Sequence, residues 1–143
     1  MTEIYLETSA VLAWLLDQNG AGSVREAVDR AEVVVTSTLT LAETERALVR
    51  AEALGHLKAA EGQRLRGLLT RAQAGWFRMT VSETVLSRAG RAFPVEPVRT
   101  LDAVHLATAL TFTQAFPDLT LLSFDRRILA NAEALGIGLP ASA

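Results

Sequence analysis

Four acidic residues lie at the edge of, or inside, otherwise apolar runs, and together they suggest cation chemistry. They are Glu7, Glu43, Asp102 and Asp125. A carboxylate in apolar surroundings is costly unless it is neutralised, hydrogen-bonded or bound to a cation. The chain has no cysteine and only two histidines. We therefore expect a hard, oxygen-preferring cation, Mg²⁺ or Mn²⁺ rather than zinc, shared by the four carboxylates.

Each acid also has a purely structural explanation. Thr40 and Glu43 match a capping box, in which the glutamate reaches back to the start of its own helix. Asp102 in a first helical turn would complement the helix dipole, and Asp125 would cap the last helix. Glu7 would pair with an arginine. We favour one shared site, because the structural explanation requires four separate coincidences.

Short β-type runs alternate with longer helical patterns, as in an α/β domain with a parallel sheet covered on both faces. Strands are predicted at Ile4–Glu7, Val33–Ser37, Phe77–Thr80 and Thr120–Ser123, with Ile137–Leu139 as a candidate edge strand. Helices are predicted at Ser9–Leu16, Ser23–Ala31, Thr40–Leu54, Leu57–Ala74, Ser82–Ala92, Thr100–Phe112 and Arg126–Leu135. We expect residues 1–143 to form one domain.

The predicted elements bring the four acids to one edge of the sheet. Glu7 ends the first strand and Asp125 follows the strand Thr120–Ser123. Glu43 and Asp102 are each expected in the first turn of a helix. In open α/β sheets, ligands bind beyond the carboxyl ends of the strands, where the strand order reverses. The site is therefore predicted at that edge.

Composition excludes several classes of protein. The absence of cysteine excludes disulfide frameworks, zinc ribbons and thiol nucleophiles. The segment Met1–Leu16 lacks the basic region of a signal peptide. The longest apolar stretches reach about ten residues, short of a membrane span. The net charge of −2 indicates no particular partner. We expect a cytoplasmic protein that does not associate with membranes.

His105 lies three residues after Asp102 on the same helical face, which is a spacing that could serve metal ligation. A histidine surrounded by alanine, valine and leucine is more often a hydrogen-bonded core residue, and we favour that interpretation. A hydrolase triad of Ser9, His105 and Asp102 is disfavoured, because the chain has no G-x-S-x-G nucleophile elbow.

The motifs around the acids resemble those of the PIN domain, the fold of VapC-type toxin ribonucleases. The segment YLETSAVLAWL is similar to the first motif of that family and STLTLAETERAL to the second. LDAVHLATAL is close to the third motif and LLSFDRRIL to the fourth. The resemblance runs from Ile4 to about Ile137, with the acids in the expected order and spacing.

This resemblance implies a three-layer PIN-like fold, with a mostly parallel central sheet of four or five strands flanked by helices. It implies an endoribonuclease that depends on Mg²⁺ or Mn²⁺ and hydrolyses RNA phosphodiester bonds. Such a protein is often the toxin of a toxin–antitoxin pair and often a homodimer, so an antitoxin protein is an expected partner. The resemblance assigns catalytic, metal-binding roles to Glu7, Glu43, Asp102 and Asp125, with Ser9 and Ser123 as supporting hydroxyls.

The chain departs from the family pattern at position 7, where glutamate replaces the usual aspartate. The extra methylene moves the carboxylate outward by roughly 1.5 Å unless the side chain bends back. The alternative function is therefore a catalytically weakened PIN-like domain that binds RNA or a protein partner. We favour the nuclease, because the other three acids match the pattern.

Overall fold

A four-stranded parallel sheet forms the centre of the computed structural model, which describes residues 2–141. Its strands are β1 (Glu3–Leu6), β2 (Val33–Ser37), β3 (Phe77–Met79) and β4 (Thr120–Leu122). They lie in the order β3-β2-β1-β4, and every pairing is parallel. The predicted parallel α/β architecture is confirmed.

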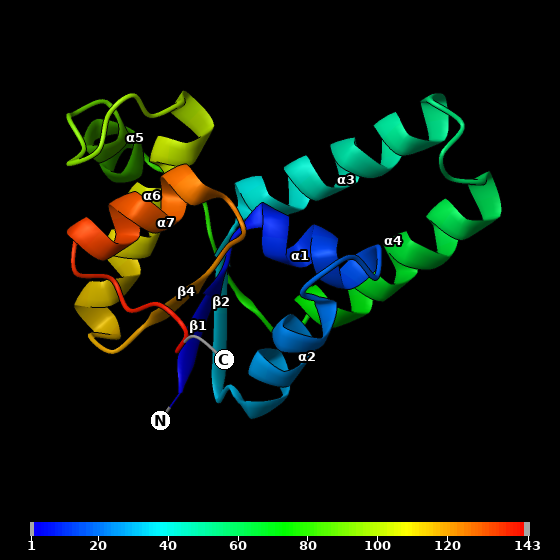
Figure 1. Ribbon diagram of the computed structural model, residues 1–143, viewed down its shortest axis with the longest axis horizontal. Helices are drawn as coiled ribbons and strands as arrows, with labels where there is room; N and C mark the ends of the chain where they lie inside the picture. Colours follow the sequence, from blue (N-terminus) through cyan, green and yellow to red (C-terminus); the bar gives the residue numbers. More distant parts are fainter. Residues whose placement is uncertain (1, 142–143) are drawn as a thin grey trace.

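Helices cover both faces of this sheet and give three layers (Figure 1). The first four are α1 (Thr8–Leu15), α2 (Ala21–Arg30), α3 (Thr38–Ala53) and α4 (Ala59–Gln73), which lie on one side. The others are α5 (Glu83–Ala89), α6 (Thr100–Ala115) and α7 (Arg126–Ala134), which lie on the opposite side. The α3–α4 hairpin extends away from the sheet.

Alternation along β1 builds the two halves of the core. Ile4 and Leu6 point to one face and pack in the same cluster as Leu48 of α3. Tyr5 lies between them, points to the other face and packs in a cluster with Leu106 of α6. Successive side chains of a strand point to opposite faces. An apolar strand such as β1 is therefore suited to the centre of a sheet that is covered on both sides.

The strand order reverses beside β1. The chain moves outward from β1 to β2 and β3, then returns to place β4 on the opposite side of β1. Glu7 directly follows β1, and its N–H donates to the carbonyl of Leu122 at the end of β4 over 3.1 Å. The carboxyl ends of β1 and β4 therefore form the switch point at which α/β sheets bind ligands.

Helix α3 begins earlier than the sequence predicts. Its N-cap is Ser37, whose hydroxyl accepts a hydrogen bond from the N–H of Leu39 over 3.0 Å. The first turn contains no acidic residue, so Glu43 lies in the second turn. Our placement of Glu43 in the first turn, and its capping box with Thr40, are wrong. Ser37 is both the last residue of β2 and the N-cap of α3, so no loop separates the strand from the helix.

The candidate edge strand Ile137–Leu139 is reduced to one parallel bridge between Gly138 and Thr120. A Cβ atom on Gly138 would lie 2.7 Å from the carbonyl oxygen of Leu119, so this approach requires glycine.

Helix α6 is buried, as the sequence predicts, since Asp102 through Ala109 are all buried. In the described part of the chain, no helix combines the length and apolarity needed to cross a membrane.

Candidate active site

Glu7 is the N-cap residue of α1 and is only 6% exposed. Its Oε1 atom accepts hydrogen bonds from the hydroxyl of Ser9 over 2.5 Å and from that of Ser123 over 2.6 Å. The Ser123 hydroxyl in turn accepts from the N–H of Asp125 over 3.0 Å. Ser9 comes from α1 and Ser123 from the end of β4. Both predicted supporting hydroxyls therefore contact Glu7, and within residues 2–141 no arginine forms an ion pair with this carboxylate.

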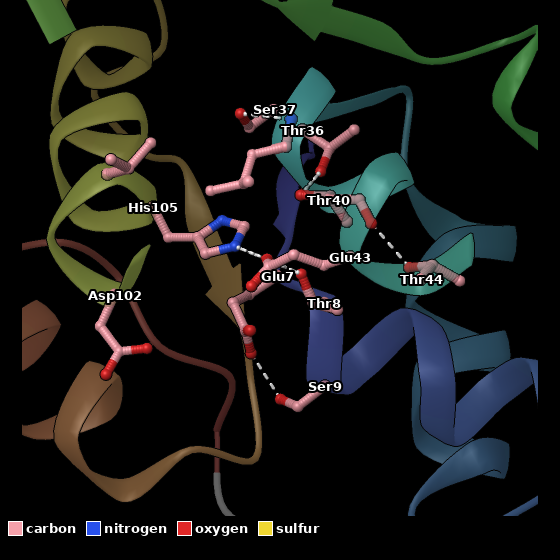
Figure 2. A network of polar contacts seen from close by, with 12 residues as sticks. Glu7, Thr8, Ser9, Thr36, Ser37, Thr40, Glu43, Thr44, Asp102 and His105 are labelled. Atoms are coloured by element: carbon pink, nitrogen blue, oxygen red, sulfur yellow. Dashed lines mark hydrogen bonds and ion pairs between the residues drawn. The ribbon is translucent and has the colours of Figure 1, made fainter. Parts of the chain in front are cut away.

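Glu43 enters the same region from α3 and lies beside two donors (Figure 2). Its Oε1 accepts from the Thr8 hydroxyl and contacts Nε2 of His105, each over 2.6 Å. Burial raises the pKa of Glu43, but the hydrogen bonds from His105 and Thr8 outweigh it. The positive charge of Arg99 adds to them, and the net effect lowers the pKa of Glu43 below its ordinary value. Glu43 is therefore held as a carboxylate.

His105 is buried, as a core histidine should be, but it also contacts a site acid. Its Nδ1 lies 2.8 Å from the Tyr5 hydroxyl, and its Nε2 faces Glu43 (Figure 2). Burial, and then the charge of Glu7, raise the pKa of Tyr5, so the phenol stays protonated. A carboxylate only accepts hydrogen bonds, so a neutral His105 must carry its proton on Nε2. Tyr5 then donates to Nδ1 and fixes the ring.

Arg99 bridges the remaining two acids. Its Nε donates to Asp102 over 2.9 Å, and its Nη2 donates to Asp125 over 3.1 Å. The hydrogen bond and charge of Asp102, with the charge of Asp125, raise the pKa of the guanidinium. Asp125 also accepts from the N–H groups of Arg127 and Ile128, so it caps α7 as the structural alternative predicts. Asp102 lies in the first turn of α6, as expected.

Asp102 and Asp125 thus share one partner, Arg99, whereas Glu7 and Glu43 are each held by donors of their own. Each carboxylate faces a protein donor, and within residues 2–141 no three acidic or histidine side chains converge on a common ion position. Every acid nevertheless supplies a hard oxygen donor, the kind that Mg²⁺ and Mn²⁺ prefer. One cation, the Arg99 guanidinium, already bridges two of the acids and lowers the pKa of a third. The donor set therefore suits a divalent cation in place of that guanidinium.

Two contacts of this site could not be assigned from the sequence. The sequence places Arg99 next to the predicted helix Thr100–Phe112 and assigns it no contact with an acid. For His105 it favours a core role over metal ligation. The spacing of Arg99, Asp102 and His105 at intervals of three does place them along one helical face. That spacing was the available signal, but only the fold shows that Glu43 and Asp125 meet this face.

A groove runs along α3 from Glu43. It has a volume of about 670 Å³ and is also lined by Arg46, Arg50 and Leu101. Both arginines are exposed. The groove therefore joins a site acid to positively charged side chains on the protein surface.

Comparison with known proteins identifies related chains. The PIN domain family model matches residues 4–135. Ribonuclease VapC35 of Mycobacterium tuberculosis is 34% identical over 140 residues, which cover 96% of each chain.

Two crystal structures have the same fold. One is Mycobacterium tuberculosis VapC20, described as a sarcin-ricin loop cleaving toxin, with a TM-score of 0.64 and 18% identity. The match covers 89% of this chain and 93% of VapC20. The other is VapBC2 from Rickettsia felis, bound to a DNA fragment from the VapBC2 promoter, with a TM-score of 0.60 and 11% identity. That match covers 90% of this chain and 92% of the other.

Proposed function

This chain belongs to the PIN-domain family, and on that premise we propose that it is a divalent-metal-dependent endoribonuclease that hydrolyses RNA phosphodiester bonds. The observation that supports the proposal is that Arg99, a cation, bridges Asp102 and Asp125 beside the switch point between β1 and β4, which Glu7 directly follows. The name of the relative VapC35, a ribonuclease, supports RNA as the substrate.

In this proposal Glu7, Glu43, Asp102 and Asp125 hold Mg²⁺ or Mn²⁺. A bound ion supplies Lewis-acid stabilisation of the charge that develops on phosphodiester oxygens, and it favours ionisation of water. Neighbouring side chains hold two of these acids, Glu7 and Glu43, in fixed orientations. Ser9 and Ser123 orient Glu7, whereas Thr8 and the Tyr5–His105 pair orient Glu43.

The α3 groove gives RNA a path to the acids. Arg46 and Arg50 line the same groove as Glu43. Guanidinium groups bind phosphate oxygens through paired N–H donors and remain charged at all physiological pH values. An RNA backbone lying along α3 would therefore be attracted toward the carboxylates by these two arginines.

The same proposal includes a biological context. We infer that the protein is the toxin of a toxin–antitoxin pair, partnered by an antitoxin protein, and that it acts as a homodimer. The similar structures of VapC20, a toxin, and of VapBC2 bound to promoter DNA support the toxin assignment and a second, DNA-associated component. The homodimer rests on family resemblance.

The alternative is a PIN domain that binds RNA or protein without cleaving it, favoured by glutamate at position 7. Incubation of a mixed single-stranded RNA with Mg²⁺, Mn²⁺ or chelator separates the two. We expect cleavage with either metal, none with chelator, and none by a folded Asp102→Asn protein. Tight RNA binding by the wild type without cleavage in either metal would instead establish the binding domain.

A further inference from the structure

Arg99 has an unusual combination of exposure and acidic contacts. Its side chain is 64% exposed, yet it makes ion pairs with two acids whose side chains are only 10% and 25% exposed. Of the ion pairs in residues 2–141, these are the ones that join a single arginine to two acids. The guanidinium therefore lies over the acids from the solvent side.

Breaking the ion pairs of Arg99 with Asp102 and Asp125 should cost little free energy. Exposed ion pairs contribute little to stability, because water solvates both partners and the long side chain loses freedom when it is held. The backbone of Arg99 is held instead by the start of α6, because its carbonyl accepts a hydrogen bond from the N–H of Ala103 over 2.9 Å, and the loop before it is tied to α7. The N–H of Val95 donates to the buried side chain of Asn131 over 2.8 Å, and that amide donates back to the Val95 carbonyl over 2.9 Å. A change at Arg99 is therefore confined to its side chain.

A divalent cation and Arg99 compete for the same carboxylates. While the guanidinium donates hydrogen bonds to Asp102 and Asp125, the carboxylate oxygens that accept them are not free to bind an ion. Once a divalent cation neutralises them, the arginine loses its electrostatic partners, and like charges repel at short range. The guanidinium must then move toward solvent, where its side chain is already 64% exposed.

We propose that Arg99 is an exchangeable cation of this site. It neutralises Asp102 and Asp125 in the metal-free protein and, when a divalent metal ion displaces it, binds a phosphate of the RNA substrate. The inference rests on the proposed nuclease function and deepens it. A planar guanidinium suits both states, because its fork of N–H donors matches carboxylate and phosphate oxygens equally well.

Calorimetric titration with Mn²⁺, without RNA, tests the first half. Arg99→Gln removes the competing cation, and we expect Mn²⁺ to bind about tenfold more tightly than to wild type. Arg30→Gln is the matched control, because it removes an exposed ion pair with Glu26 on α2. Equal or weaker Mn²⁺ binding by Arg99→Gln would overturn the proposal. If wild type binds no Mn²⁺, the proposed function fails together with this inference.

The second half is tested by binding of a single-stranded 2′-O-methyl oligonucleotide, whose full length is checked on a gel after each titration so that the signal reports binding alone. With Mn²⁺ present, loss of one phosphate contact should weaken binding by Arg99→Gln and reduce the slope of log affinity against log salt by about 0.7. Without metal, the slope should equal that of wild type. An unchanged slope with Mn²⁺, or the same reduction without it, would contradict the exchange while leaving the nuclease intact.

Discussion

At the scale of single residues, Glu7 shows how the site accommodates a longer acid than the family pattern. Both Ser9 and Ser123 already lie within 2.6 Å of its Oε1 atom. The two hydroxyls come from α1 and from the residue after β4, lie 3.3 Å from each other and together hold the glutamate carboxylate. The surrounding residues are therefore adapted to the extra methylene.

This adaptation makes a prediction about Glu7→Asp. Shortening the side chain withdraws the carboxylate by roughly 1.5 Å from both serines. Because a ligand displaced by about 1 Å can cost on the order of a hundredfold in rate, we expect a loss of that size in RNA cleavage. Initial rates with Mg²⁺ and Mn²⁺ measure it. Equal or faster cleavage by Glu7→Asp would show that the site still favours aspartate.

The lowered pKa of Glu43 makes a second residue-scale prediction. A carboxyl whose pKa is lower in the folded than in the unfolded protein stabilises the fold above its ordinary pKa, 4.5. That stability is lost as the pH falls below 4.5 through the lower, folded value. Urea denaturation between pH 7 and pH 3 should show a smaller loss of stability for Glu43→Gln than for wild type.

Glu45→Gln is the control, because Glu45 is exposed on the same helix. If Glu43→Gln and wild type lose stability in parallel as the pH falls, then the hydrogen bonds from His105 and Thr8 do not favour the ionised form. The sequence could identify Glu43 as an unusual acid, but not these donors. Which atoms meet Oε1 depends on helix α6 and on β1, far away in the chain.

At the scale of elements, most of the architecture follows from local patterns. The valine run predicts β2, and the apolar run after Thr100 predicts the buried helix α6. The predicted start of α3 at Thr40 is too late, because Ser37 is both the last residue of β2 and the N-cap of α3. Hydrophobic periodicity assigns each residue to a single element and cannot detect this double role. The predicted edge strand Ile137–Leu139 forms only one bridge to β4, at Gly138. This residue has no side chain and can therefore lie against the carbonyl of Leu119.

The loop before α6 depends on one buried amide. Asn131 of α7 is fully buried and exchanges two hydrogen bonds with the backbone of Val95, and it also donates to the Arg127 carbonyl. Asn131→Ala leaves these backbone groups without partners, so we expect a destabilisation of about 1–3 kcal/mol. Amide hydrogen exchange should also become faster at Val95.

The matched substitution is Glu133→Ala, at an exposed position of the same helix. It should change stability by less than about 0.5 kcal/mol. If Asn131→Ala were equally mild, or left exchange at Val95 unchanged, the loop that carries Arg99 would be held by other contacts.

At the scale of the whole molecule, the topology brings the site together. Side chains from α1, α3 and α6 lie near Glu7, which directly follows β1 (Figure 2). Ser123 and Asp125 reach the same site from the connection between β4 and α7. The sequence predicts this edge, because parallel strands share one carboxyl side. It does not predict that Arg99 bridges two acids, since that contact depends on how α6 and α7 pack together.

We predict that Glu7, Glu43, Asp102 and Asp125 share one metal site, on which the proposed activity depends. Thermal unfolding against Mn²⁺ concentration tests it most directly, because a ligand that binds only the folded protein raises its melting temperature. At a hundredfold excess over the dissociation constant, the expected rise for wild type is roughly 10 °C. Each of Glu7→Gln, Glu43→Gln, Asp102→Asn and Asp125→Asn should lose most of that rise. No rise for wild type at millimolar Mn²⁺, or a full rise in all four variants, would contradict the shared site.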